Sequence, residues 1–177
     1  MGTQAIAQAM QRAVTVLERR PEFGVHDDTP ATACWESGTR VHASHANGTT
    51  IATDMATEVG GSGDRVSPGW LFRAGVASCA ATTIAMVAAQ RGIALSRLEV
   101  RAGSRTDGRG ILGMQDAGGH AVYAGPQALE LVVTLGARGA DAGTLRTLAE
   151  DACRRSPISC AVQNATPMPM RIDVVDA

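Results

Sequence analysis

A chain of 177 residues and 18.2 kDa is long enough for one domain with a buried core. Hydrophobic residues make up 45%, charged residues 19%, and the mean hydropathy is +0.00, values that fit neither a disordered nor a membrane-embedded chain. The net charge of −1 and the aromatic content of 3% argue against a basic or base-stacking surface, so we expect no nucleic-acid partner.

All 16 basic residues are arginine. The lack of lysine excludes Schiff-base chemistry, lysine-anchored pyridoxal phosphate and the phosphate-binding lysine of a P-loop. There is no Cys-x-x-Cys pair, and His42 and His45 are three apart on a predicted strand, so they point to opposite faces. We therefore expect neither a metal site nor a bound cofactor.

Apolar residues at helical spacing predict an amphipathic helix over residues 5–20, followed by a turn-rich linker. We interpret residues 1–30 as an N-terminal helical arm and linker, and residues 31–177 as the main domain. Short strands are predicted at the start of that domain, with an Ala-Asn-Gly hairpin signal before the last of them: 31–35, 39–45 and 50–54.

The longest uncharged run lies in a predicted helix that begins at Ser67 and Pro68 and ends before Gly92. The run is rich in alanine and shorter than the roughly 20 strongly apolar residues that span a bilayer, so we interpret it as a buried core helix with no membrane role. The N-terminus shows no secretory pattern. These features predict a cytoplasmic protein whose four cysteines start reduced.

Alternating apolar residues predict further strands in the second half of the chain, over 95–105, 111–116, 128–135 and 170–175. A second helix is predicted over 142–155, capped by Asp141 and bent or restarted at Pro157. Strands that follow one another through hairpins, interrupted by two core helices, indicate an α+β fold with antiparallel sheet.

Cys79 is the candidate for chemistry, midway along the long helix. From its pattern alone, a buried unreactive cysteine is favoured over a nucleophile. A reactive thiol needs a nearby cation that favours the thiolate, and composition does not supply that partner.

The segment from Ser67 to Cys79 resembles the start of the central helix in the OsmC/Ohr family, where a proline-opened helix carries Phe-x-Ala-Gly-x-x-x-Cys. The resemblance covers residues 32–177. Further matches follow in the family's order: Arg91-Gly92-Ile93-Ala94-Leu95, Leu98-Glu99-Val100, Ser156-Pro157-Ile158-Ser159 and Asn164-Ala165-Thr166. The third of these resembles the family's Cys-Pro-[Val/Tyr]-Ser.

The resemblance implies an intertwined homodimer, with antiparallel sheets around two central helices and active sites at the interface. It also implies a thiol peroxidase in which Cys79 attacks a small hydrophobic hydroperoxide, becomes a sulfenic acid and is restored by an external thiol or dithiol reductant. The family arginine that holds the thiolate is matched by Arg40. The N-terminal helix has no counterpart in minimal family members, and we interpret it as a packing arm, with a partner-docking helix as the alternative.

Two positions depart from the family pattern. The second cysteine of the family falls on Ser156, and the glutamate that pairs with the arginine falls on Gly69. If the helix continued past Pro157, Ser156 would share a face with Cys153 and Cys160. Either one of these thiols is then a relocated resolving thiol, or both are packing residues. The alternative function is a non-catalytic dimer that senses redox state or binds a small ligand.

Overall fold

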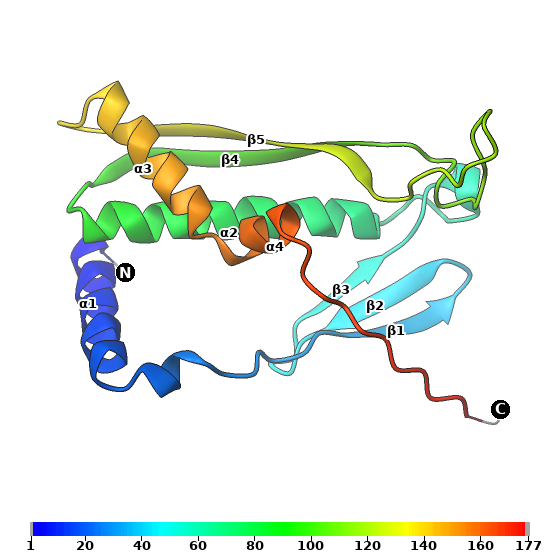
Figure 1. Cartoon of the computed structure of the whole chain (residues 1–177), viewed down its shortest axis with the longest axis horizontal. Helices are drawn as coiled ribbons and strands as arrows, with labels where there is room; N and C mark the ends of the chain where they lie inside the picture. The colour runs from blue at the N-terminus through cyan, green and yellow to red at the C-terminus, as the bar shows by residue number, and fades with distance from the viewer. Residues whose placement is uncertain (1, 176–177) are drawn as a thin grey trace.

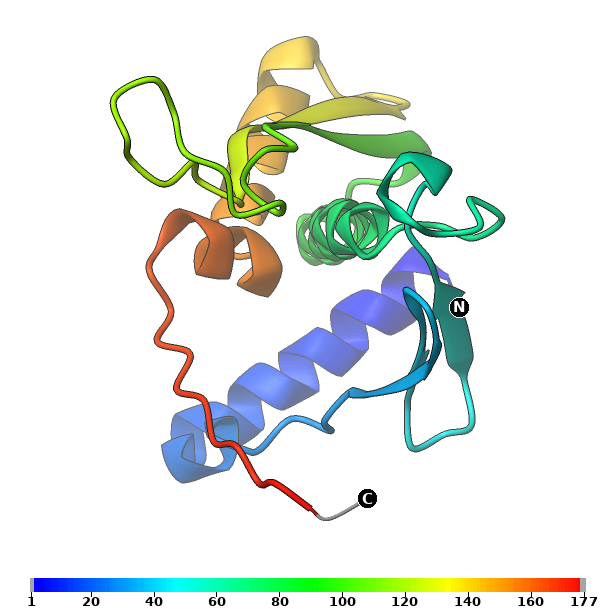
Figure 2. The same ribbon diagram turned by 90° about the vertical axis from the view of Figure 1, so that its right-hand side faces the viewer.

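The structure is a computed structural model and describes residues 2–175. Helix α2 (Pro68–Gln90) runs through the centre of the molecule. The hairpin of β4 (Leu95–Thr106) and β5 (Pro126–Ala137) covers one side of α2, and α1 (Thr3–Arg19) lies on the other side, as Figures 1 and 2 show. Helices α3 (Ala142–Arg154) and α4 (Pro157–Gln163) pack beside α2.

The ends of α2 are those predicted. Ser67 is the N-cap, and its hydroxyl accepts a hydrogen bond of 3.1 Å from the backbone N–H of Trp70. Gly92 follows the C-cap with φ of 68°, a left-handed conformation that favours glycine. The helix is long and apolar enough to cross a membrane by length and composition. Within one chain 28% of its apolar stretch is buried, and its buried residues include Ile84 and Val87 of the core.

The core forms where α2 meets α3 and the β4–β5 hairpin. Its buried members are Ile84, Val87, Ala88, Leu148 and Ala152. Partly buried leucines and valines of β4 and β5 pack against this cluster from the sheet side. This layer of helices on an antiparallel hairpin confirms the α+β class.

A separate antiparallel sheet contains β1 (Thr32–Ser37), β2 (Arg40–Ser44) and β3 (Thr50–Thr53). The predicted hairpin is present, because the backbone N–H of His45 donates to the carbonyl of Thr49. All of β1 is exposed, and β2 and β3 are only partly covered. Among residues 2–175, no apolar layer covers this sheet.

The strand predicted over 111–116 is wrong, because this segment belongs to a long loop between β4 and β5. Asp107 and Asp116 accept hydrogen bonds from backbone N–H groups two residues ahead, which holds the chain in turns. Gly113, with φ of 68°, adds a left-handed residue that a regular strand cannot contain.

The strand predicted over 170–175 is also wrong for this chain, because the segment has no regular structure and pairs with no strand. Alternation alone does not make a strand, because the backbone N–H and C=O groups must also pair with a neighbouring strand. Side chains of the segment are largely exposed, including Ile172 at 71% and Val174 at 89%.

The restart at Pro157 is confirmed. Helix α3 ends at Arg154, and α4 begins at Pro157, because proline has no backbone N–H to continue the helical hydrogen bonds. Cys153 and Cys160 therefore do not share the face of one continuous helix, and the geometry required for that shared face is absent.

Candidate active site

Cys79 is half-buried on α2 and lines a cavity of about 530 Å³ between α1 and α2, hereafter the α1–α2 cavity. The walls are mostly apolar and come from three elements. The lining includes Met10 of α1, Cys79, Met86 and Val87 of α2, and Arg155 and Pro157 at the junction of α3 and α4. A thiol in this position is open to a small apolar molecule and partly shielded from water.

Ser156 lies directly behind the Cys79 sulfur. Its hydroxyl donates to Cys79 Sγ over 3.2 Å, although the two residues are 77 apart in the sequence. The hydroxyl of Ser159 donates in turn to Ser156 Oγ over 3.1 Å, and both serines are buried. The structure thus brings together two positions that the sequence motifs singled out separately.

Arg40 lies elsewhere in the chain, on β2. Its guanidinium bonds to the carboxylates of Asp54 and Asp64 and to the hydroxyl of Ser62. The hydrogen bond to Asp54 raises the pKa of Arg40. Bonds from the hydroxyls of Ser62 and Thr39 hold the pKa of the Asp54 carboxyl well below its usual range. Arg40 is not part of the lining of the α1–α2 cavity within one chain.

Arg155 is the arginine in the lining of the α1–α2 cavity, and no sequence motif predicted it as a site residue. Its guanidinium donates to Asp151 over 2.7 Å, and its side chain is 54% exposed. Met10 was missed as a site residue as well. The only sequence signal for Arg155 is its place beside the serine-proline motif.

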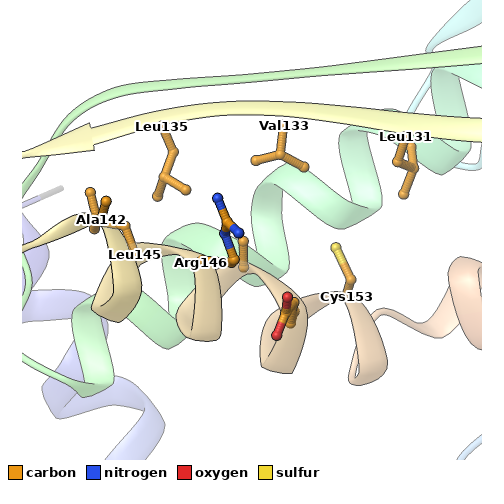
Figure 3. A pocket seen from close by; sticks show the side chains of 9 residues that line it. Leu131, Val133, Leu135, Ala142, Leu145, Arg146 and Cys153 are labelled. Carbon is orange, nitrogen blue, oxygen red and sulfur yellow. The ribbon is translucent and has the colours of Figure 1, made fainter.

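Cys153 and Cys160 face other surroundings than Cys79. Figure 3 shows the Cys153 side chain in a second cavity, between α3 and β5, with Leu131 and Val133 opposite. Burial raises the pKa of the Cys153 thiol, which disfavours its thiolate. The thiol of Cys160 donates to the carbonyl of Arg154 over 3.1 Å. These contacts favour packing roles, and a relocated resolving thiol stays a prediction.

Within residues 2–175, no group of three or more His, Cys, Asp or Glu side chains is placed to hold a metal ion. The reactive groups that line the α1–α2 cavity include a thiol, hydroxyls and a guanidinium.

The family model of OsmC-like proteins matches residues 61–170, more than half of the chain. The chain belongs to the OsmC-like family. The match includes α2, both sheet strands β4 and β5, and the α3–α4 junction, so Cys79 and Ser156 lie inside the family domain. Helix α1 lies outside it. None of the curated protein sequences matches the chain.

Solved structures agree with the OsmC-like assignment. An OsmC-like protein from Mycoplasma pneumoniae is 14% identical, with a TM-score of 0.65 over 80% of this chain and 91% of that one. Organic hydroperoxide resistance proteins from Elizabethkingia anophelis and Legionella pneumophila are 21% and 22% identical, with TM-scores of 0.58 and 0.55. They cover 80% and 78% of this chain, and 91% of each of those chains. At these identities the similarity establishes the OsmC fold.

Proposed function

We propose that the protein is a thiol-dependent peroxidase that reduces small hydrophobic organic hydroperoxides through a sulfenic acid on Cys79. The observation that carries the proposal is the placement of the Cys79 sulfur, which opens onto a mostly apolar cavity and accepts a hydrogen bond from Ser156. Similarity to organic hydroperoxide resistance proteins supports the choice of substrate class.

In the proposed reaction, the Cys79 thiolate attacks the terminal oxygen of the hydroperoxide. The O–O bond breaks, an S–O bond forms, and the leaving alkoxide takes a proton from solvent to become an alcohol. Sulfur is oxidised by two electrons and the peroxide is reduced by two. An external thiol then displaces water from the sulfenic acid to give a mixed disulfide, and a second thiol releases Cys79. This cycle needs no bound cofactor.

An external reductant is part of the proposal because Ser156 occupies the family position of the second cysteine. An alcohol oxygen does not condense with a sulfenic acid to give a disulfide. With Ser156 at this position, the sulfenic acid on Cys79 therefore persists and faces the α1–α2 cavity, where an external thiol can reach it. We place the protein in the cytoplasm, where thiol reductants are abundant.

The OsmC-like family is generally homodimeric, and the area of the chain supports a dimer here. One chain exposes 12985 Å², whereas a compact monomer of this mass exposes about 8,100 Å². The excess includes large apolar side chains on the β1–β3 sheet, on α2 and on the C-terminal segment, such as Trp35 at 71%, Trp70 at 48% and Ile172 at 71% exposed. A second copy that covers these surfaces removes this apolar area from water.

Arg40 stays our prediction for the cation that favours the thiolate when two subunits form the site. Arg155 is the candidate within one chain, because it lines the α1–α2 cavity. Replacing each arginine by alanine and measuring peroxide consumption separates the two, since the activating cation is the one whose loss lowers the rate.

A non-catalytic dimer that senses redox state or binds a small ligand is the second candidate. The observation that favours it is the pairing of Arg40 with two carboxylates, which neutralise the cation in this chain. Reversible oxidation of Cys79 without turnover of hydroperoxide supports this second function.

The deciding experiment measures consumption of cumene hydroperoxide with dithiothreitol as reductant. We expect Cys79→Ser to abolish consumption, while Cys34→Ser, a change at an exposed cysteine on β1, retains it. Consumption that survives Cys79→Ser refutes the peroxidase proposal. After one equivalent of hydroperoxide, mass spectrometry should find a sulfenic acid on Cys79, whereas an internal disulfide to Cys153 or Cys160 supports the relocated thiol.

A further inference from the structure

Two serine hydroxyls form a chain of hydrogen bonds that ends on the Cys79 sulfur. Ser159 Oγ donates to Ser156 Oγ over 3.1 Å, and Ser156 Oγ donates to Cys79 Sγ over 3.2 Å. Ser156 is 0% exposed and Ser159 is 5% exposed, so water competes little for these hydroxyls. With these donor roles, the Ser156 hydroxyl is the last donor of the chain and faces the sulfur.

The Ser156 hydroxyl is not used to cap its helix. Ser156 is the N-cap of α4, yet its side chain makes no capping hydrogen bond. At the starts of α2 and α3, by contrast, the side chains of Ser67 and Asp141 accept a backbone N–H in the usual way. The contact with Cys79 therefore replaces the ordinary role of a serine at this position.

We propose that Ser156 is a positioning residue that holds the Cys79 sulfur as a thiolate directed into the α1–α2 cavity, and that Ser159 fixes the Ser156 hydroxyl as a donor. This inference rests on the proposed function and names the groups that prepare its nucleophile. A thiolate can only accept hydrogen bonds, and a hydrogen bond to an anion is stronger than one to a neutral group. The serine chain thus favours the ionised sulfur over the neutral thiol.

Among the described residues, the other groups that line the α1–α2 cavity make no hydrogen bond to the Cys79 sulfur. Among the described residues that line the α1–α2 cavity, Arg155 is the charged one besides the Cys79 thiolate, and it is paired with Asp151. The lining residues of α1 and α2 other than Cys79 carry uncharged side chains, for example the thioether of Met10 and the amide of Gln90. The Ser156 hydroxyl is the group with a direct hydrogen bond to the sulfur.

The test is the pH profile of Cys79 alkylation by iodoacetamide in the reduced protein, followed on the Cys79 peptide by mass spectrometry. We expect Ser156→Ala to move the midpoint of the profile to higher pH and to lower the rate at pH 7 about tenfold, the loss of one hydrogen bond to a charged group. Ser159→Ala should move the midpoint in the same direction by less, because the direct donor remains.

Ser78→Ala is the matched control. Ser78 lines the same cavity as Cys79, but its hydroxyl donates to the carbonyl of Gly75 over 3.2 Å and not to the sulfur, so its loss should leave the midpoint unchanged. An unchanged midpoint in Ser156→Ala overturns the inference, as does an equal shift in Ser78→Ala. If Ser156→Ala does not fold, an unchanged midpoint in Ser159→Ala overturns the inference instead.

Alkylation does not require peroxidase activity, so the two proposals fail separately. A shifted midpoint together with hydroperoxide consumption that persists in Cys79→Ser keeps the serine chain and refutes the peroxidase. A constant midpoint together with hydroperoxide consumption that depends on Cys79 refutes the serine chain and keeps the peroxidase.

Discussion

Restoring a cysteine at position 156 should convert the site into one that forms an internal disulfide. The Ser156 oxygen lies 3.2 Å from the Cys79 sulfur, and a disulfide needs a separation of about 2.05 Å, so the two atoms must approach by about 1 Å. Sulfur lies farther from Cβ than oxygen does, which supplies part of that approach. We expect Ser156→Cys to form this bond after one equivalent of cumene hydroperoxide.

The stabilisation from that bond can be worked out from the sequence separation. A cross-link between positions 77 apart restricts the unfolded chain by about 4.5 kcal/mol, an upper value because native-state strain subtracts from it. Loss of the buried serine hydroxyl costs about 1 kcal/mol in both redox states of the variant. The oxidised variant should therefore melt on the order of 10 °C above its reduced form.

Intact mass and thermal melting give the readout. Oxidised Ser156→Cys should lose about 2 Da relative to its reduced form, whereas the wild type gains about 16 Da as a sulfenic acid. Ser78→Cys is the control, because adjacent side chains on a helix point in different directions and should not bridge. A stable sulfenic acid in Ser156→Cys, with no loss of mass, refutes the placement of Ser156 against Cys79.

Three further changes test other parts of the structure. Met10→Ala should widen the α1–α2 cavity and raise alkylation of Cys79 by a bulky maleimide more than by iodoacetamide, and equal changes would contradict a wall role for α1. Leu148→Ala should lower the free energy of unfolding by about 3 kcal/mol in urea melts, because Leu148 is fully buried. The pKa of Asp54 is lowered in the folded protein, so its carboxylate stabilises the fold at pH values above the unfolded pKa of about 3.9. This stabilisation is lost as the pH falls toward the folded pKa. Asp54→Asn should therefore make the free energy of unfolding depend less on pH in the acid range.

The sequence by itself determined the elements whose signals are local. The cap at Ser67, the left-handed glycine at position 92 and the proline at 157 set the ends of helices, because each acts on its own backbone hydrogen bonds. Alternating apolar residues predicted β4 and β5, because that pattern is contained within each strand. Cys79 and Ser156 came from motifs, as separate positions.

Only the tertiary structure decided which of these residues meet. Packing of α4 on α2 brings Ser156 to Cys79, and the placement of α1 and the α3–α4 junction adds Met10 and Arg155 to the cavity. In the same packing, residues 170–175 pair with no strand, despite their alternating pattern. Alternation and spacing describe one segment at a time, whereas a site or a strand pair depends on contacts between segments distant in the chain.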